Sequence, residues 1–138
     1  MDKLKNPQNQ EQLSEWVREQ FQKANKHLAE NGVLFKSVVA EDSRYLAPFC
    51  AVWKINANDN NQYWVISGDL PSDYLPISAA EDARGAIKYF SFKWQMQAEE
   101  IRSQVVSDKT QLDYAILLET KAEEIYKVQD NAQLWQDQ

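Results

Sequence analysis

The stretch from Tyr63 to Ile77 constrains the fold more than any other part of the chain. It begins with aromatic and β-branched residues, which predict a strand, and continues through a glycine and two prolines that a helix interior does not tolerate. The sequence before this stretch indicates one helix and further strands, and the periodicity after it is helical. We therefore predict an α+β fold, in which helices pack on one face of a small antiparallel sheet.

The first helix is predicted from about residue 9 to residue 31. Apolar residues recur every three or four positions in this segment, as on one face of an amphipathic helix. Asn6 followed by Pro7 is typical of a helix N-terminus, and Gly32 is typical of the position just after a C-terminus.

Three strands are predicted as an antiparallel meander between residues 33 and 67. They are expected at 33–40, 47–55 and 63–67, joined by a polar turn after the first and an Asn-rich turn after the second. Trp53 and Trp64 are expected near one another across the second hairpin, with the register left open.

Helical periodicity returns after the prolines and continues almost to the end of the chain. Ser78 with Glu81 forms a capping box, which predicts a helix from about residue 79. The pattern is interrupted at residues 107–110, where Asp108 with Gln111 can cap a new helix. One bent helix over 79–136 and an antiparallel hairpin are both compatible with this pattern, although the hairpin buries both apolar stripes better.

The length of 138 residues fits a single domain, residues 1–138. Its ends, residues 1–8 and 131–138, are expected to fray unless Trp135 docks on the body.

The net charge of −6, from 21 acidic and 15 basic residues, opposes binding to nucleic acid. The chain shows neither an apolar run of about 20 residues, as a membrane span needs, nor a signal peptide. The lone cysteine, Cys50, has apolar neighbours and is predicted to be a buried thiol in a reducing compartment. We therefore predict a cytoplasmic protein that contacts neither nucleic acid nor membrane.

Motifs of known catalytic chemistry are not found in the sequence. With His27 as the sole histidine and Cys50 as the sole cysteine, a zinc site of the usual kind is excluded. Phosphate-binding glycine motifs and a nucleophile elbow are also missing. We predict no cofactor and no metal, and favour a protein that is not an enzyme.

The loop at residues 67–74 is the best candidate for a functional site. Asp69 and Asp73 lie four residues apart beside hydroxyls and aromatic rings, and such a pair can bind a cation or a basic group of a partner. The structural alternative is that Gly68 supplies a positive φ and Asp69 caps the turn. The candidate contacts are completed by Trp64, Tyr74 and Arg84.

Aromatic residues on either side of this loop could line a pocket, although packing is the simpler interpretation. Phe90 and Trp94 fall on the apolar stripe of the following helix, whereas Tyr89 and Phe92 do not. If residues of this group are exposed together in a patch, that patch marks an interface.

Residues Pro48 to Gln95 resemble a family of small bacterial proteins of unknown function. The resemblance rests on the run from Tyr63 to Tyr74, on Ala83-Arg84, and on the aromatic residues Phe90 and Trp94. It implies a bacterial, single-domain, cytoplasmic protein, and it transfers no activity, cofactor or catalytic residue.

Two functional hypotheses follow. The first is a non-enzymatic protein-interaction or regulatory domain that offers an acidic loop and aromatic surface to a protein partner. The alternative is a small-molecule binding domain or modest enzyme, with its site at the loop 67–74 and the start of the following helix. A homodimer through the two C-terminal helices is compatible with either hypothesis.

Overall fold

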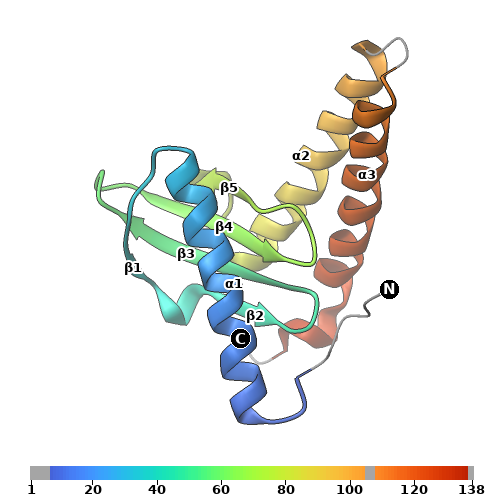
Figure 1. The fold of residues 1–138 in the computed structure, drawn as a ribbon. Coiled ribbons are helices and arrows are strands. Elements are labelled where there is room, and N and C mark those ends of the chain that lie inside the picture. Colours follow the sequence, from blue (N-terminus) through green and yellow to red (C-terminus); the bar gives the residue numbers. More distant parts are fainter. Residues whose placement is uncertain (1–6, 105–107, 137–138) are drawn as a thin grey trace. The chain divides into compact units, whose positions relative to one another are not determined.

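The computed structural model describes residues 7–104 and 108–136 (Figure 1). The chain divides into two compact units, one ending at Ala86 and the other beginning at Ile87, and each is described by itself. An N-terminal helix, an antiparallel sheet and two C-terminal helices follow one another, which confirms the α+β class. The assignment of residues 1–138 to one domain stays a prediction.

Helix α1 spans Gln10–Glu30 and agrees with the sequence prediction within one residue at each end. Its first turn is capped by Asn9, whose side-chain oxygen accepts a hydrogen bond from the Gln12 backbone N–H at 2.8 Å. The predicted cap, Asn6, lies outside the described residues. The helix ends as expected, with Gly32 at φ 80° just beyond its C-terminus.

The sheet has five antiparallel strands rather than the three predicted. They are β1 (Phe35–Val38), β2 (Arg44–Leu46), β3 (Cys50–Ala57), β4 (Gln62–Gly68) and β5 (Asp73–Pro76). The order is β1-β3-β4-β5, and β2 also pairs with β3. The added strands, β2 and β5, have three and four residues, which is too short for an alternating pattern to stand out.

The register of β3 and β4 places the two tryptophans of this hairpin on opposite faces. Trp53 pairs with Val65, and Lys54 pairs with Trp64. Because side chains alternate along a strand, Trp53 and Trp64 point away from each other. The expectation that they lie near one another across the hairpin is therefore wrong.

Figure 1 shows α1 lying across one face of the sheet. The core between them places Trp53 on that face. The ring of Phe21 meets the ring of Trp53 edge-on, with centroids 5.4 Å apart. The buried residues of this core come from α1, from β3 and β4, and from the segment between α1 and β1: Ala24, Leu28, Val33, Ala51, Trp53, Ile55, Ala57 and Val65.

A buried hydroxyl joins α1 to both central strands. The Trp53 indole N–H donates to Ser67 Oγ at 3.1 Å, and Ser67 Oγ donates to the backbone carbonyl of Gln20 at 2.8 Å. Ser67 is fully buried, so its oxygen provides a polar partner that water cannot replace.

Helix α2 spans Ala83–Gln104 and begins four residues after the predicted start. Asp82, and not Ser78, caps it, since Asp82 Oδ1 accepts from the Gly85 backbone N–H at 2.8 Å. Ser78 lies in a short 3₁₀ helix, Ile77–Ala79. The predicted capping box at Ser78 is therefore wrong.

The C-terminal unit contains an antiparallel hairpin of α2 and α3 (Lys109–Asp130), which lie side by side in Figure 1. Arg102 forms a two-pronged ion pair with Glu119, both contacts at 2.7 Å. Nearer the other end, Ser91 Oγ donates to the Ala122 carbonyl at 2.8 Å. Later residues of α3 thus meet earlier residues of α2, and the single bent helix is excluded.

The start of α3 follows the sequence prediction. Asp108 accepts from the backbone N–H groups of Thr110, at 3.0 Å, and Gln111, at 3.4 Å. The apolar stripe of each helix is buried, apart from the partly buried residues Ile101 and Leu112. The buried stripe residues are Ala83, Ile87, Phe90, Trp94 and Ala98 in α2, and Ala115, Leu118, Ala122, Ile125 and Val128 in α3. The sequence pattern continues the apolar stripe of α2 to Val105, which lies outside the described residues.

Trp135 docks on the C-terminal unit. It lies in a 3₁₀ helix, Ala132–Trp135, is buried, and donates its indole N–H to the Val128 carbonyl at 3.2 Å. Residues 131–136 are therefore docked on this unit through Trp135 and are not frayed. The expected fraying of residues 1–6 and 137–138 lies outside the described residues.

We predict that Ser67→Ala lowers the free energy of unfolding by about 1–3 kcal/mol, because the buried indole N–H of Trp53 loses its acceptor. Urea unfolding followed by tryptophan fluorescence measures the change. Ser78→Ala, at an exposed serine, is the matched control and should change stability by less than about 0.5 kcal/mol. Equal effects of the two substitutions would contradict the role given to Ser67.

Candidate functional site

The loop predicted as the functional site is a short connection between two paired strands. Gly68 ends β4 and Asp73 begins β5, and Ile66 pairs with Asp73 across the ladder. The loop is therefore shorter than the predicted 67–74, because residues 67–68 belong to β4 and residues 73–74 belong to β5. The backbone of those residues is held by the sheet.

The backbone geometry at position 68 requires a glycine. Its φ is 148°, and a Cβ at this position would lie 2.5 Å from the Phe49 carbonyl oxygen and 2.8 Å from Cys50 Cα. The end of β4 thus passes directly over the start of β3, and the predicted positive φ is confirmed. The role of Gly68 is to permit this close approach.

The two aspartates differ in their surroundings. Asp73 is half-buried, and its Oδ1 accepts from the backbone N–H of Tyr74 at 2.8 Å. Asp69 is exposed, and its own backbone N–H donates to the Phe49 carbonyl at 3.4 Å. Asp73 therefore already serves the local backbone, whereas the predicted cap by Asp69 stays a prediction.

Trp64 and Tyr74 lie on opposite faces of the sheet. Trp64 is 1% exposed, and its indole N–H donates to the Ala80 carbonyl at 3.1 Å. Tyr74 pairs with Val65, a residue of the α1 core, and its ring lies 5.8 Å from that of His27. These two predicted contacts therefore cannot face one common ligand.

Arg84 completes the predicted set. It lies in the first turn of α2 and is half-buried. Of the six predicted residues, Gly68, Asp69 and Asp73 lie in one connection, whereas Trp64 and Tyr74 point to different sides of the sheet.

A small polar pocket lies at the opposite end of β3. It has a volume of about 240 Å³, below the roughly 300 Å³ of typical small-molecule sites. Its lining residues are Lys36, Ser37, Asn56, Ala57, Asn60 and Asn61. The Asn56 amide donates to Ser37 Oγ at 2.9 Å and accepts from Gln62 at 2.8 Å, so its polar groups serve the sheet.

The turn beside this pocket carries one perturbed carboxylate. The Tyr63 hydroxyl donates to Asp59 Oδ2 at 2.6 Å, and this hydrogen bond lowers the pKa of Asp59 and raises the pKa of Tyr63. Among the residues described, no three His, Cys, Asp or Glu side chains gather as ligands for a metal ion. In the same part of the chain, none of the helices is both long and apolar enough to cross a membrane.

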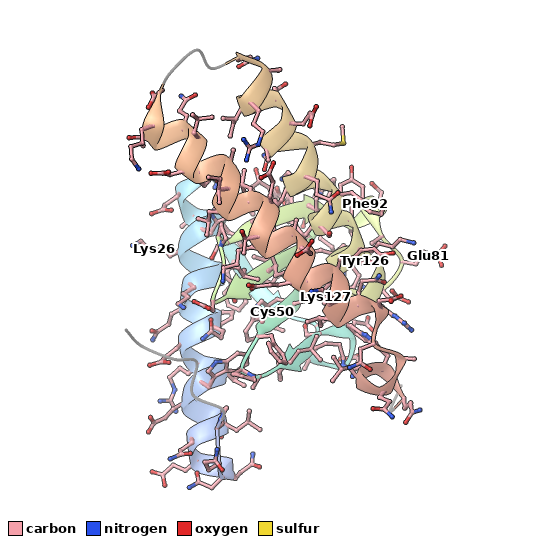
Figure 2. The ribbon with its side chains drawn as sticks, turned by 90° about the vertical axis from the view of Figure 1, so that its right-hand side faces the viewer. Lys26, Cys50, Glu81, Phe92, Tyr126 and Lys127 are labelled. Atoms are coloured by element: carbon pink, nitrogen blue, oxygen red, sulfur yellow. The ribbon has the colours of Figure 1, made fainter. Side chains whose placement is uncertain are left out.

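A second candidate surface lies on the helical hairpin. Tyr89 and Phe92 are each 46% exposed and Met96 is 73% exposed, at the spacing that places them on one side of α2. Tyr126 of α3 is 37% exposed, and its ring lies 6.2 Å from that of Phe92. Figure 2 shows Phe92 and Tyr126 beside one another. We call Tyr89, Phe92, Met96 and Tyr126 the aromatic face.

Two members of the aromatic face were indicated by the sequence and two were missed. Tyr89 and Phe92 fall off the buried stripe, and this position predicts that they are exposed and available for an interface. Met96 lies four residues after Phe92, so the same spacing would have found it. Tyr126 becomes a neighbour of Phe92 through the hairpin alone, and nothing local in the sequence signals that contact.

The single cysteine is buried, and its thiol is unreactive. Burial raises the pKa of the Cys50 thiol to about 12. The thiolate is the nucleophilic form, so Cys50 is unsuited to catalysis at neutral pH. This confirms the predicted buried thiol.

We expect the folded chain to react with a thiol-specific reagent such as Ellman's at pH 8 far more slowly than the urea-unfolded chain. Burial raises the pKa of the Cys50 thiol, so at that pH a much smaller fraction of Cys50 is thiolate in the folded state than in the unfolded state. Absorbance of the released chromophore measures both rates. Equal rates in folded and unfolded protein would contradict the burial of Cys50.

Gly68→Ala is predicted to destabilise the protein by more than about 2 kcal/mol, because its Cβ meets fixed backbone as well as an unfavourable φ. Gly32→Ala is the matched control: Gly32 also has a positive φ, but a Cβ there meets nothing within 4 Å. We expect about 1 kcal/mol for that change. Chemical unfolding of both variants makes the comparison, and an equal cost would refute the close-approach role of Gly68.

Residues 9–135 match the model of a domain of unknown function, DUF4826. No curated protein and no solved structure matches the chain significantly.

Proposed function

The chain belongs to the DUF4826 family of domains of unknown function, and we propose that it is a non-enzymatic protein-interaction domain. The observation that carries the proposal is the aromatic face on α2 and α3. Tyrosine and other aromatic residues contribute strongly to binding at protein interfaces because they bury large areas with little loss of side-chain freedom. The bacterial cytoplasm is the proposed location, on the basis of the resemblance and the reduced cysteine.

The size of the aromatic face supports this proposal. A large side chain of this kind presents roughly 200 Å², so the four partly exposed side chains leave about 400 Å² of surface open. The largest apolar patches on monomeric proteins fall in this range, and they are often functional. Scattered single apolar residues would need no such explanation.

The hairpin also holds these side chains in a fixed arrangement. The ring of Phe92 lies beside the ring of Tyr126, tilted by 34° from it, and Lys88 Nζ lies 6.0 Å from the Phe92 ring. Ser91, next to Phe92, is tied to the backbone of α3 by its hydroxyl. A pre-organised surface loses less freedom on binding, which favours association.

The alternative of a ligand site at the loop 67–74 has weaker support. Trp64 is buried and Tyr74 lies on the other face of the sheet, so these two cannot contribute to one pocket. Asp73 already accepts a backbone hydrogen bond. The catalytic use of two aspartates needs both to face the same reacting group.

Site-specific photo-crosslinking in the source organism tests the proposal. We expect a benzophenone amino acid at position 92 to yield a discrete crosslinked product with a protein. The same probe at Phe49, which is also 46% exposed but lies outside the hairpin, should yield none of that product. Absence of a discrete product from position 92, or the same product from both positions, would overturn the proposed function.

A further inference from the structure

We propose that the partner of the aromatic face is a second copy of this chain, bound in antiparallel orientation about a twofold axis that runs across α2 and α3. This inference rests on the proposed function and specifies its partner. The inference comes from the charges around the aromatic face, because positive and negative side chains lie at opposite ends of that face.

Lysine flanks one end of the aromatic face. Lys88 lies one turn before Phe92 on α2, and Lys127 follows Tyr126 on α3, and both are exposed. Because the helices are antiparallel, these two residues lie toward the same end of the hairpin. Asp130 lies at that end too, so the end carries a net positive charge from these three side chains.

Glutamate flanks the other end. Glu99 lies one turn after Met96, and Glu123 lies one turn before Tyr126, and both are exposed. The ion pair of Arg102 with Glu119 also lies there and is neutral in sum. The aromatic face therefore has a positive end and a negative end.

A surface with this polarity is complementary to itself when one copy is reversed. A twofold interface brings the same patch of both copies together, so each charge must meet its opposite across the axis. Lys88 is six residues before Trp94 and Glu99 is five after it, which corresponds to about 9 Å and about 7.5 Å along the helix. With the axis near the level of Trp94, Lys88 lies level with Glu99 of the second copy.

The same twofold axis also brings opposite charges of the two α3 helices together. Lys127 and Glu123 lie on either side of residue 125, so Lys127 of one copy lies level with Glu123 of the other. Each α2 then packs antiparallel on the α2 of the second copy, and each α3 on its counterpart. The aromatic residues near the centre lose contact with water.

A twofold axis parallel to the helices gives the opposite result. It would place the α2 of one copy on the α3 of the other without exchanging the two ends, with Lys88 close to Lys127 and Glu99 close to Glu123. Like charges at short range oppose that arrangement. The charge pattern thus selects one of the two symmetric ways in which the aromatic face can meet itself.

The available area agrees with a dimer of moderate affinity. A 22-residue helix is about 33 Å long, and two neighbouring helices form a face roughly 20 Å wide. The resulting area of about 650 Å² approaches the roughly 800 Å² that each partner contributes to a standard interface.

The test is a charge-reversal cycle measured by sedimentation equilibrium of purified full-length protein at micromolar concentrations. The first variant carries Lys88→Glu with Lys127→Glu, and the second carries Glu99→Lys with Glu123→Lys. We expect the unmodified chain to form a dimer, and each variant alone to dimerise at least about tenfold more weakly, because every flanking contact becomes repulsive. An equimolar mixture should recover the dimer, because each contact then joins opposite charges.

A control variant with the same change in net charge as the first variant distinguishes the effect of where the charges lie from the effect of the total charge. Lys26→Glu with Lys36→Glu alters two exposed lysines outside the hairpin and should leave the dimer intact. Circular dichroism of each variant confirms that it is folded.

The possible outcomes separate the two proposals. A monomeric unmodified chain, or a mixture that fails to recover the dimer, overturns the second copy as partner. If position 92 still crosslinks to a different protein in that case, the interaction function stands and the twofold dimer does not. If the chain is monomeric and position 92 gives no crosslink, both proposals fail.

Discussion

The buried hydroxyl of Ser67 is the contact on which the N-terminal unit depends. A helix and a hairpin can be packed together by apolar side chains in several slightly different positions. The bonds from Trp53 to Ser67 and from Ser67 to the Gln20 carbonyl allow one position, since any shift leaves a buried polar atom without a partner. The core around Trp53 then determines which face of every strand is covered by α1. The divergence of Trp64 and Tyr74, and with it the weak support for a ligand site, follows from that assignment of faces.

The C-terminal unit is held in a comparable way, and the result bears on function. Ser91 and Arg102 fix how far α2 and α3 are displaced along one another, and the buried stripes supply the apolar area between them. With the displacement fixed, Phe92 falls beside Tyr126. The aromatic face is thus a consequence of hairpin register. A one-turn slip of one helix would move a partner by about 5.4 Å and separate the rings.

Local sequence signals predicted the helices. Features that depend on contacts between distant residues could not be predicted from such signals. Gly32 and Asp108 act through the backbone next to them, so the end of α1 and the start of α3 could be read from the sequence. Ser78 satisfies the same local rule but caps nothing, because the Ala80 carbonyl is bonded to Trp64, sixteen residues earlier in the chain, and Ala80 is extended. Strand β5 was missed for a similar reason: its ladder with β4 stabilises it, and its four residues show no pattern of their own. For the candidate site, the sequence indicated the glycine's positive φ and the exposure of Tyr89 and Phe92, but not the contact between the two helices.

An exposed aromatic surface needs protection against unwanted association, and the flanking charges provide it here. Apolar contact has no direction, so four exposed apolar side chains alone would accept many partners in many orientations. Lysine at one end and glutamate at the other make most of these orientations repulsive and leave the reversed one attractive. Specificity obtained in this way depends on the contrast between arrangements more than on the strength of any ion pair, each of which is weak at an exposed site. Because the net charge of the chain is −6, two copies also repel one another at long range. Their association therefore requires a close, correctly oriented contact, which the polarity of the aromatic face supplies.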